Sequence, residues 1–143
     1  MARKAQFDVL KVNRLFTVRE NIGSVGFAAA TDGSNKTKVT LTPKDEAGKA
    51  LVGPRKLEIY LSDDATGVGL TGTAASGNVV DGGDGVDLSD LTAKKHKIVQ
   101  TAATGAYQLS ITDTGKTQYY VCVVDPISGM PFVAGRILTA NYG

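Results

Sequence analysis

The chain has 143 residues, of which 42% are hydrophobic, enough apolar material for one core and therefore for one domain with extensions. Its 17 Gly, its low aromatic share of 6% and the absence of Trp favour short strands joined by turns over helices. A formal net charge of +2 is too small to predict binding to nucleic acid or to an anionic membrane, and the single cysteine, Cys122, excludes an internal disulfide.

The charge is unevenly distributed along the chain. Residues 1–20 carry five basic and two acidic side chains, a net charge of +3, whereas residues 57–93 carry seven acidic and no basic side chains, a net charge of −7. This division fits two solvated faces, and it also fits opposite patches that meet between neighbouring copies. No apolar run has the length of a signal peptide or of a bilayer span, so we expect a protein made and kept in the bacterial cytosol unless something else carries it out.

The first segment of the chain lacks a regular period. FDVLKV and RLFTVRE could each form a strand, but GSVGFAAATDGSN is small, Gly-rich and poorly periodic. We therefore predict an extended N-terminal arm over residues 1–34 and one domain over residues 35–143. Apolar residues accompany the basic ones in the arm, which favours protein contacts over phosphate contacts. The candidate partner-binding residues are Arg3, Lys4, Phe7, Leu10, Arg14, Phe16 and Arg19.

From Lys38 onward the sequence alternates with a period of two, which is typical of half-buried strands. The predicted strands are KVTLTP, KLEIYLS, HKIVQT, YQLSIT, YYVCVVD and FVAGRILTA. YYVCVVD is apolar on both faces, which indicates either a central strand covered on both sides or a strand that docks one face on a partner. Gly- and Asp-containing turns at intervals of about 8–15 residues favour an antiparallel sandwich. The best helical candidate is a turn or two over residues 87–93.

A Gly- and Asp-rich stretch, GGDGVD at residues 82–87, matches the opening of a calcium-binding nonapeptide repeat. It occurs once, and Ser89 stands where that repeat needs a large apolar residue. The aspartates of this stretch are three residues apart rather than two, and the stretch has no terminal Glu. It therefore does not match the helix-loop-helix calcium-binding motif either. We expect an acidic loop that is flexible or ordered by a partner, and calcium binding by residues 81–90 stays open.

The residues with reactive side chains form no recognisable catalytic set. His96, the only histidine, lies among lysines and is expected to be an exposed strand residue, and Cys122 is expected to be a small core residue. One His and one Cys are too few for a zinc site. The glycine stretch TGVGLTG is followed by no Gly-Lys-Ser or Gly-Lys-Thr, so it predicts no phosphate loop. We therefore predict no catalytic residues, no metal ligands and no cofactor.

KVTLTPKDEAGKALVGPRKLEIYLSDD and the later TAATGAYQLSITDTGKTQYYVCVVD resemble bacterial immunoglobulin-like domains, with the match carried by residues 45–48, 105–112 and 113–124. The resemblance covers about residues 37–139 and implies an all-β fold, an immunoglobulin-like antiparallel β-sandwich. The antibody-type Cys pair and Trp are absent, so no antigen-binding property transfers. IYLSDDATG, the Gly- and Asp-rich insertion and ITDTGKTQYYV are also similar to small immunoglobulin-like proteins of tailed-bacteriophage particles.

These likenesses imply a non-enzymatic virion protein, such as a capsid decoration or cement protein, that binds neighbouring capsid subunits through its arm and its sandwich surface. The expected partners are other virion proteins, either the major capsid protein or tail components, in a homo-oligomeric or symmetric assembly without a membrane or nucleic acid. An alternative is a carbohydrate- or receptor-binding module that uses the loops of residues 63–90. The absence of Phe, Tyr and Trp from residues 61–106 counts against a sugar platform.

Overall fold

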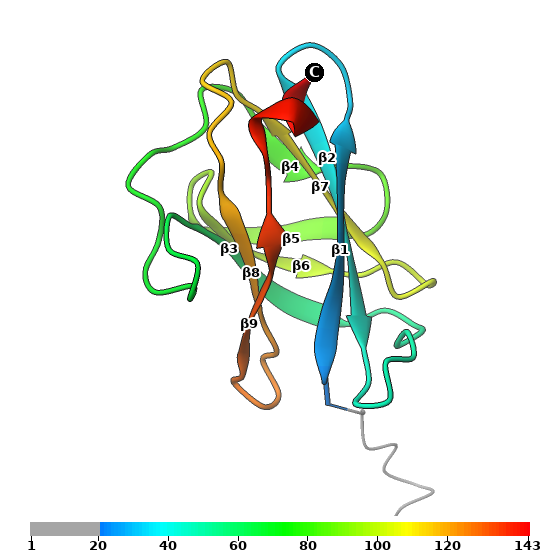
Figure 1. Cartoon of the computed structure of the whole chain (residues 1–143). Coiled ribbons are helices and arrows are strands. Elements are labelled where there is room, and N and C mark those ends of the chain that lie inside the picture. Colours follow the sequence, from blue (N-terminus) through cyan, green and yellow to red (C-terminus); the bar gives the residue numbers. More distant parts are fainter. Residues whose placement is uncertain (1–20) are drawn as a thin grey trace, which may run out of the picture.

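The computed structural model describes residues 21–143 as two antiparallel sheets packed face to face (Figure 1). The first sheet has the spatial order β1 (Ser24–Thr31), β2 (Lys36–Lys44), β7 (Tyr107–Thr112) and β4 (Val79–Asp81). The second has the order β5 (Val86–Thr92), β6 (His96–Gln100), β3 (Lys56–Ser62), β8 (Tyr120–Val124) and β9 (Pro131–Arg136), and a 3-10 helix, η1 (Thr139–Tyr142), follows it. The prediction of an all-β antiparallel sandwich is confirmed.

The core lies between the sheets and consists of the alternating apolar residues that the sequence places on one face of each strand. Successive side chains of a strand point to opposite faces of the sheet, so a period of two sends one set inward. Fully burying a residue of this size contributes about 1.5–3 kcal/mol. The inward set includes Val39, Leu41, Leu57, Ile59, Leu61, Val99, Tyr107, Leu109, Ile111, Val121 and Val123.

Strand β8 is covered on both faces, as one of the two interpretations of YYVCVVD predicts. Its outer face is covered by the loop of residues 63–78, drawn in green beside β3 and β8 in Figure 1. The Gly67 carbonyl accepts a 2.6 Å hydrogen bond from the Tyr60 hydroxyl. A Cβ on Gly67 would lie 3.0 Å from Val133 and 3.2 Å from the sulfur of Cys122. A loop of the same chain therefore buries Cys122.

Residues 24–31, which the sequence analysis assigned to the arm, form strand β1 of the sandwich. The strand pairs with β2 along its whole length, from Ser24 opposite Lys44 to Thr31 opposite Thr37. Val25, Phe27 and Ala29 pack against the core from alternate positions. The residues between them are mostly small, and Ala and Gly differ little in hydrophobicity from apolar residues. The period of two is therefore hard to recognise in the sequence of β1. The sandwich therefore begins before residue 35, and the proposed arm is shorter than residues 1–34.

Residues 87–93 are not helical, because residues 86–92 form the edge strand β5. The strand pairs with β6 through two register shifts, one between Asp87 and Ser89 and one between Asp90 and Thr92. Each shift inserts one extra residue and moves the alternation by one position, so the local sequence shows no clean period of two. The three-residue strand β4 also has no signal in the sequence, because it is too short for a period.

Candidate functional site

A polar cluster ties the two sheets together on the side of the sandwich formed by β4 and β5. The Lys97 ammonium on β6 lies 2.5 Å from the Asp87 carboxylate on β5 and donates a 2.7 Å hydrogen bond to the carbonyl of Val79 on β4. The other Asp87 oxygen accepts a 2.5 Å hydrogen bond from the Tyr107 hydroxyl on β7. Asp87, Lys97 and Tyr107, here called the clasp, therefore join strands of both sheets.

The clasp is enclosed, which suits a structural role. The Lys97 side chain is only 3% exposed, and a charge with so little solvent needs a charged or hydrogen-bonding partner. Burial raises the pKa of the Tyr107 hydroxyl, and its hydrogen bond to Asp87 raises that pKa further, so the phenol stays protonated and donates. This cluster was not predicted from the sequence. The feature of the sequence that could have revealed it is Lys97, which lies two residues before the buried Val99 and therefore on the same, inward face of the strand.

The GGDGVD motif packs its loop against β7. Gly82 N–H donates to the Gln108 carbonyl at 2.7 Å, and Gln108 N–H donates to the Asp84 carbonyl at 2.9 Å. Gly85 has φ +79°, and a Cβ there would lie 2.5 Å from the Gln100 carbonyl oxygen. The loop is therefore ordered by its own domain, and the expectation of a flexible or partner-ordered loop is wrong.

The arrangement of the aspartates does not support the hypothesis that this motif binds a metal ion. Asp87 is paired with Lys97, and Asp90 lies 3.6 Å from the same ammonium. Within residues 21–143, no group of three or more His, Cys, Asp or Glu side chains is placed to hold a metal ion. The aspartates of residues 81–90 thus carry the clasp and an acidic surface beside it.

Strand β5 exposes three large apolar side chains. Val86, Leu88 and Leu91 are 50%, 45% and 50% exposed, and we call these three residues the β5 ridge. The register shifts leave Leu88 and Leu91 without a partner residue on β6. Asp87, which belongs to the clasp, is the one residue of β5 that is not exposed. The clasp therefore anchors a strand whose remaining side chains face solvent.

The other edge strands of the described part of the chain are short or shielded. Strand β4 has three residues. Strand β1 is approached from outside by η1, where the Asn141 amide donates to the Ala29 carbonyl at 3.3 Å. Strand β9 starts at Pro131 and contains a register shift, and both features discourage pairing with another chain. Among these edges, β5 is the one that combines a long strand with a row of exposed large apolar side chains.

Ile22 and Gly23 define where the chain enters the sandwich from its N-terminal segment. Ile22 is 5% exposed, and its N–H donates to the Asp125 carboxylate at 3.4 Å. Gly23 N–H donates to the Lys44 carbonyl at 2.8 Å. A Cβ on Gly23 would lie 2.6 Å from the Cα of Glu46, so only glycine fits there. These contacts therefore hold the start of the sandwich at a defined position beside the turn that contains Glu46.

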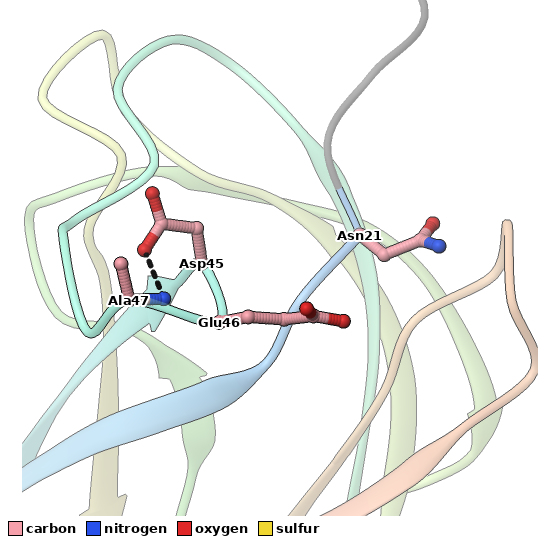
Figure 2. A pocket seen from close by; sticks show the side chains of 4 residues that line it. All are labelled: Asn21, Asp45, Glu46 and Ala47. Carbon is pink, nitrogen blue, oxygen red and sulfur yellow. Dashed lines mark hydrogen bonds between the residues drawn. The ribbon is translucent and has the colours of Figure 1, made fainter.

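A hollow beside this entry point is lined by Asn21, Asp45, Glu46 and Ala47 (Figure 2). The Asp45 carboxylate accepts 2.9 Å hydrogen bonds from the backbone N–H groups of Ala47 and Lys49, so it stabilises its own turn. Glu46 is the one carboxylate of the hollow without a hydrogen bond or ion pair to another described residue. The hollow thus offers no convergent set of groups for proton transfer or nucleophilic attack.

His96 is half-buried, so the expectation of an exposed strand residue is wrong. Its Nε2 lies 2.5 Å from the Glu58 carboxylate on β3, and the histidine side chain is 20% exposed. The Tyr60 ring meets the imidazole edge to face, with centroids 6.0 Å apart. Cys122 is fully buried as expected, and burial raises the pKa of its thiol. Within residues 21–143, the carboxylate of Glu58 is the group in hydrogen-bonding range of the His96 ring.

The predicted partner-binding residues Arg3, Lys4, Phe7, Leu10, Arg14, Phe16 and Arg19 all lie outside the described residues. In the described part, the candidate site is therefore the β5 ridge with its acidic neighbours, together with the anchored entry point at Ile22. Sequence reasoning missed the ridge, because it assigned residues 87–93 to a helical turn.

Comparisons with protein-family models, with curated proteins and with solved structures found no match for this chain. The described residues include no helix long and apolar enough to cross a membrane.

Proposed function

We propose that this protein is a non-enzymatic structural protein of a tailed-bacteriophage particle, a capsid decoration protein that binds neighbouring capsid subunits through its N-terminal arm and its sandwich surface. The observation that carries the proposal is that the buried charged groups of Lys97, Asp113 and Asp125 form hydrogen bonds within the sandwich, while β5 exposes large apolar side chains and residues 1–20 carry a net charge of +3. The resemblance of the chain to bacteriophage immunoglobulin-like proteins supports the choice of particle.

The use of the buried carboxylates supports a role without chemistry. Asp113 accepts backbone hydrogen bonds from Ser76, Gly115 and Thr117. Asp125 accepts from Ile22 and from Ile127. Groups committed to loop N–H donors in this way hold a structure together and are not free to accept a substrate proton.

The fixed entry point supports an adhesive role for the arm. The buried Ile22 and the close approach of Gly23 to the turn at Glu46 hold the base of the arm on a defined end of the sandwich. A fixed base lowers the entropy that the arm loses on binding. Repeating such a contact by symmetry on a particle raises the total affinity far above that of a single contact.

The hydrogen bonds accepted by the carboxylates of the loop count against the alternative of a carbohydrate- or receptor-binding module. The Asp63 carboxylate accepts hydrogen bonds from the Thr71 hydroxyl at 2.5 Å and from Gly72 N–H at 2.9 Å. The Asp64 carboxylate accepts from the N–H and the hydroxyl of Thr66, both at 2.7 Å. Both carboxylates therefore stabilise their own loop, which leaves them less able to receive sugar hydroxyls.

The experiment is the protein inventory of tailed particles from cells that encode the chain. Particles are purified on a density gradient, and their proteins are identified by mass spectrometry. We expect the full chain in the particles and a variant lacking residues 2–20 in the free protein fraction. A matched control, Phe7→Leu with Phe16→Leu, keeps the apolar arm and should still enter the particles. Particles without this chain would refute the proposed function, and incorporation of the deletion variant would refute the role of the arm.

A further inference from the structure

We propose that the β5 ridge is the receptor for the N-terminal arm of a second copy of this chain, so that copies join arm to ridge. The inference deepens the proposed function by naming one partner of the arm, and to that extent it rests on it. It starts from two segments of opposite charge: exposed apolar side chains lie among acidic residues on β5, and the sequence of residues 1–20 combines apolar with basic residues.

The ridge is shaped for side-chain docking. Leu88 and Leu91 are the extra residues of the two register shifts, so they protrude from the strand without a partner on β6. The same irregularity discourages continuous backbone pairing with another strand. Val86, Leu88 and Leu91 therefore offer apolar contact while the edge resists open-ended sheet growth. The clasp holds the strand beneath them in place through Asp87.

The charges of the two segments are complementary. Residues 79–92 contain four aspartates and no Lys or Arg, and the clasp neutralises one of them, Asp87. Asp81 and Asp84 have no hydrogen bond or ion pair from their side chains to other described residues, and Asp90 is 55% exposed and forms a 3.6 Å ion pair with the Lys97 ammonium. The arm brings a net charge of +3. Opposite charges around an apolar centre favour encounter and define the orientation of docking.

The arm has the pattern and the length that the ridge requires. Residues 10–18 contain the apolar side chains Leu10, Val12, Leu15, Phe16 and Val18 with Lys11 and Arg14 among them, so the segment presents apolar and basic groups together. Residues 86–91 of β5 span about 17 Å, which about six extended residues of the arm can cover. Residues 10–18 precede the anchored Ile22 by 4 to 12 residues, so an extended chain can place them roughly 13–43 Å from it, far enough to reach an adjacent sandwich.

The topology favours a second copy over the arm's own sandwich. The arm enters at the start of β1, the edge of the first sheet that lies farthest from β4. On that side, the Phe27 ring of β1 packs on the backbone of Gly135 in β9. The ridge lies on the opposite side, with β4 and β5. The arm base and the ridge therefore face apart, which is the arrangement of a head-to-tail contact that continues into rings or arrays.

The test is the mass of the purified full-length protein by sedimentation velocity across a range of concentrations. We expect the wild type to self-associate, and less so at high salt. Leu88→Asp with Leu91→Asp, and separately Leu10→Asp with Phe16→Asp, should each weaken self-association about tenfold or more. Val68→Asp, which changes a 74% exposed valine in the loop beside β8 and β9, is the control and should associate as the wild type does.

Mixing the two double variants gives the decisive result. The ridge variant keeps its arm and the arm variant keeps its ridge, so we expect the mixture to form a dimer with a single contact at concentrations where each variant alone is mainly monomeric. A monomeric wild type at all concentrations, or a ridge variant that associates normally, would overturn the inference. Neither result depends on particles, so this inference can fail while the particle inventory succeeds.

Discussion

The ammonium nitrogen of Lys97 lies 2.5 Å from the carboxylate of Asp87, and this pair holds the edge strand β5 on the sandwich. The lysine is nearly solvent-free and the aspartate is 24% exposed, so the pair is more protected than a surface ion pair. The strand that displays the ridge thus depends on a charge contact between residues ten positions apart in the sequence.

Removing one member of that pair should destabilise the fold. We expect Lys97→Met to lower the free energy of unfolding by about 2–3 kcal/mol, because Asp87 loses its ammonium partner in a poorly hydrated position. Lys97→Met combined with Asp87→Asn should recover part of that loss, because no unpaired charge remains. Urea unfolding of the three proteins measures both effects. A Lys97→Met variant as stable as the wild type would show that the pair contributes nothing.

The carboxyl group of Asp113 should make the stability depend on pH in the acid range. Burial by itself would raise the pKa of Asp113, but the hydrogen bonds from Thr117, Ser76 and Gly115 outweigh it and hold the pKa at about 2. The folded pKa lies below the unfolded value of about 3.9, so the contribution of about 2 kcal/mol is present above pH 4 and is lost as the pH falls toward 2.

Asp113→Asn isolates this contribution. We expect the variant to lose less stability than the wild type between pH 5 and pH 2, measured by chemical unfolding at each pH. Asp84→Asn also removes one carboxylate, at an exposed position, and serves as the control for the change in net charge. Parallel profiles for the wild type and Asp113→Asn would contradict the assignment.

The contact between Phe27 and Gly135 should tolerate no added methyl group. A Cβ on Gly135 would lie 2.4 Å from the Phe27 ring, so Gly135→Ala must displace the ring that closes β1 onto β9. We expect a loss of about 1–3 kcal/mol in thermal or chemical unfolding. Gly72→Ala is the control, because its nearest neighbour would be a side-chain oxygen at 3.7 Å. Equal stability of the two variants would argue against this packing.

The loop that covers Cys122 should control access to its thiol. We expect a thiol reagent to modify the native protein slowly and the unfolded protein at once, because the thiol is buried and burial raises its pKa. Gly67→Ala should accelerate labelling by about tenfold, because its Cβ would press on Val133 and Cys122 and favour opening of the loop. Gly69 shares the positive φ but has open space around it, so Gly69→Ala separates backbone strain from the clash. Rapid labelling of the native wild type would show that the loop does not shield the thiol from the reagent.

The strands with a clean alternation were predictable from the sequence, and the irregular ones were not. KLEIYLS and YQLSIT became β3 and β7 because each places its apolar residues on a single face. Strand β5 escaped prediction because two extra residues shift its alternation. Strand β1 escaped because its small residues give little contrast. Part of the candidate site was visible as the acidic charge of residues 57–93, but the ridge within it was not.

The sequence by itself determined the fold class and the inward faces of the main strands, because side chains alternate between the two faces of a strand that has no bulge. It also set the opposition between a basic N-terminal segment and an acidic middle. The tertiary structure decided which residues pair with the buried charge of Lys97, which loop covers Cys122 and which edge strand exposes apolar side chains. These outcomes depend on contacts between strands and loops that a local period does not encode, since pairing brings together residues from distant parts of the chain.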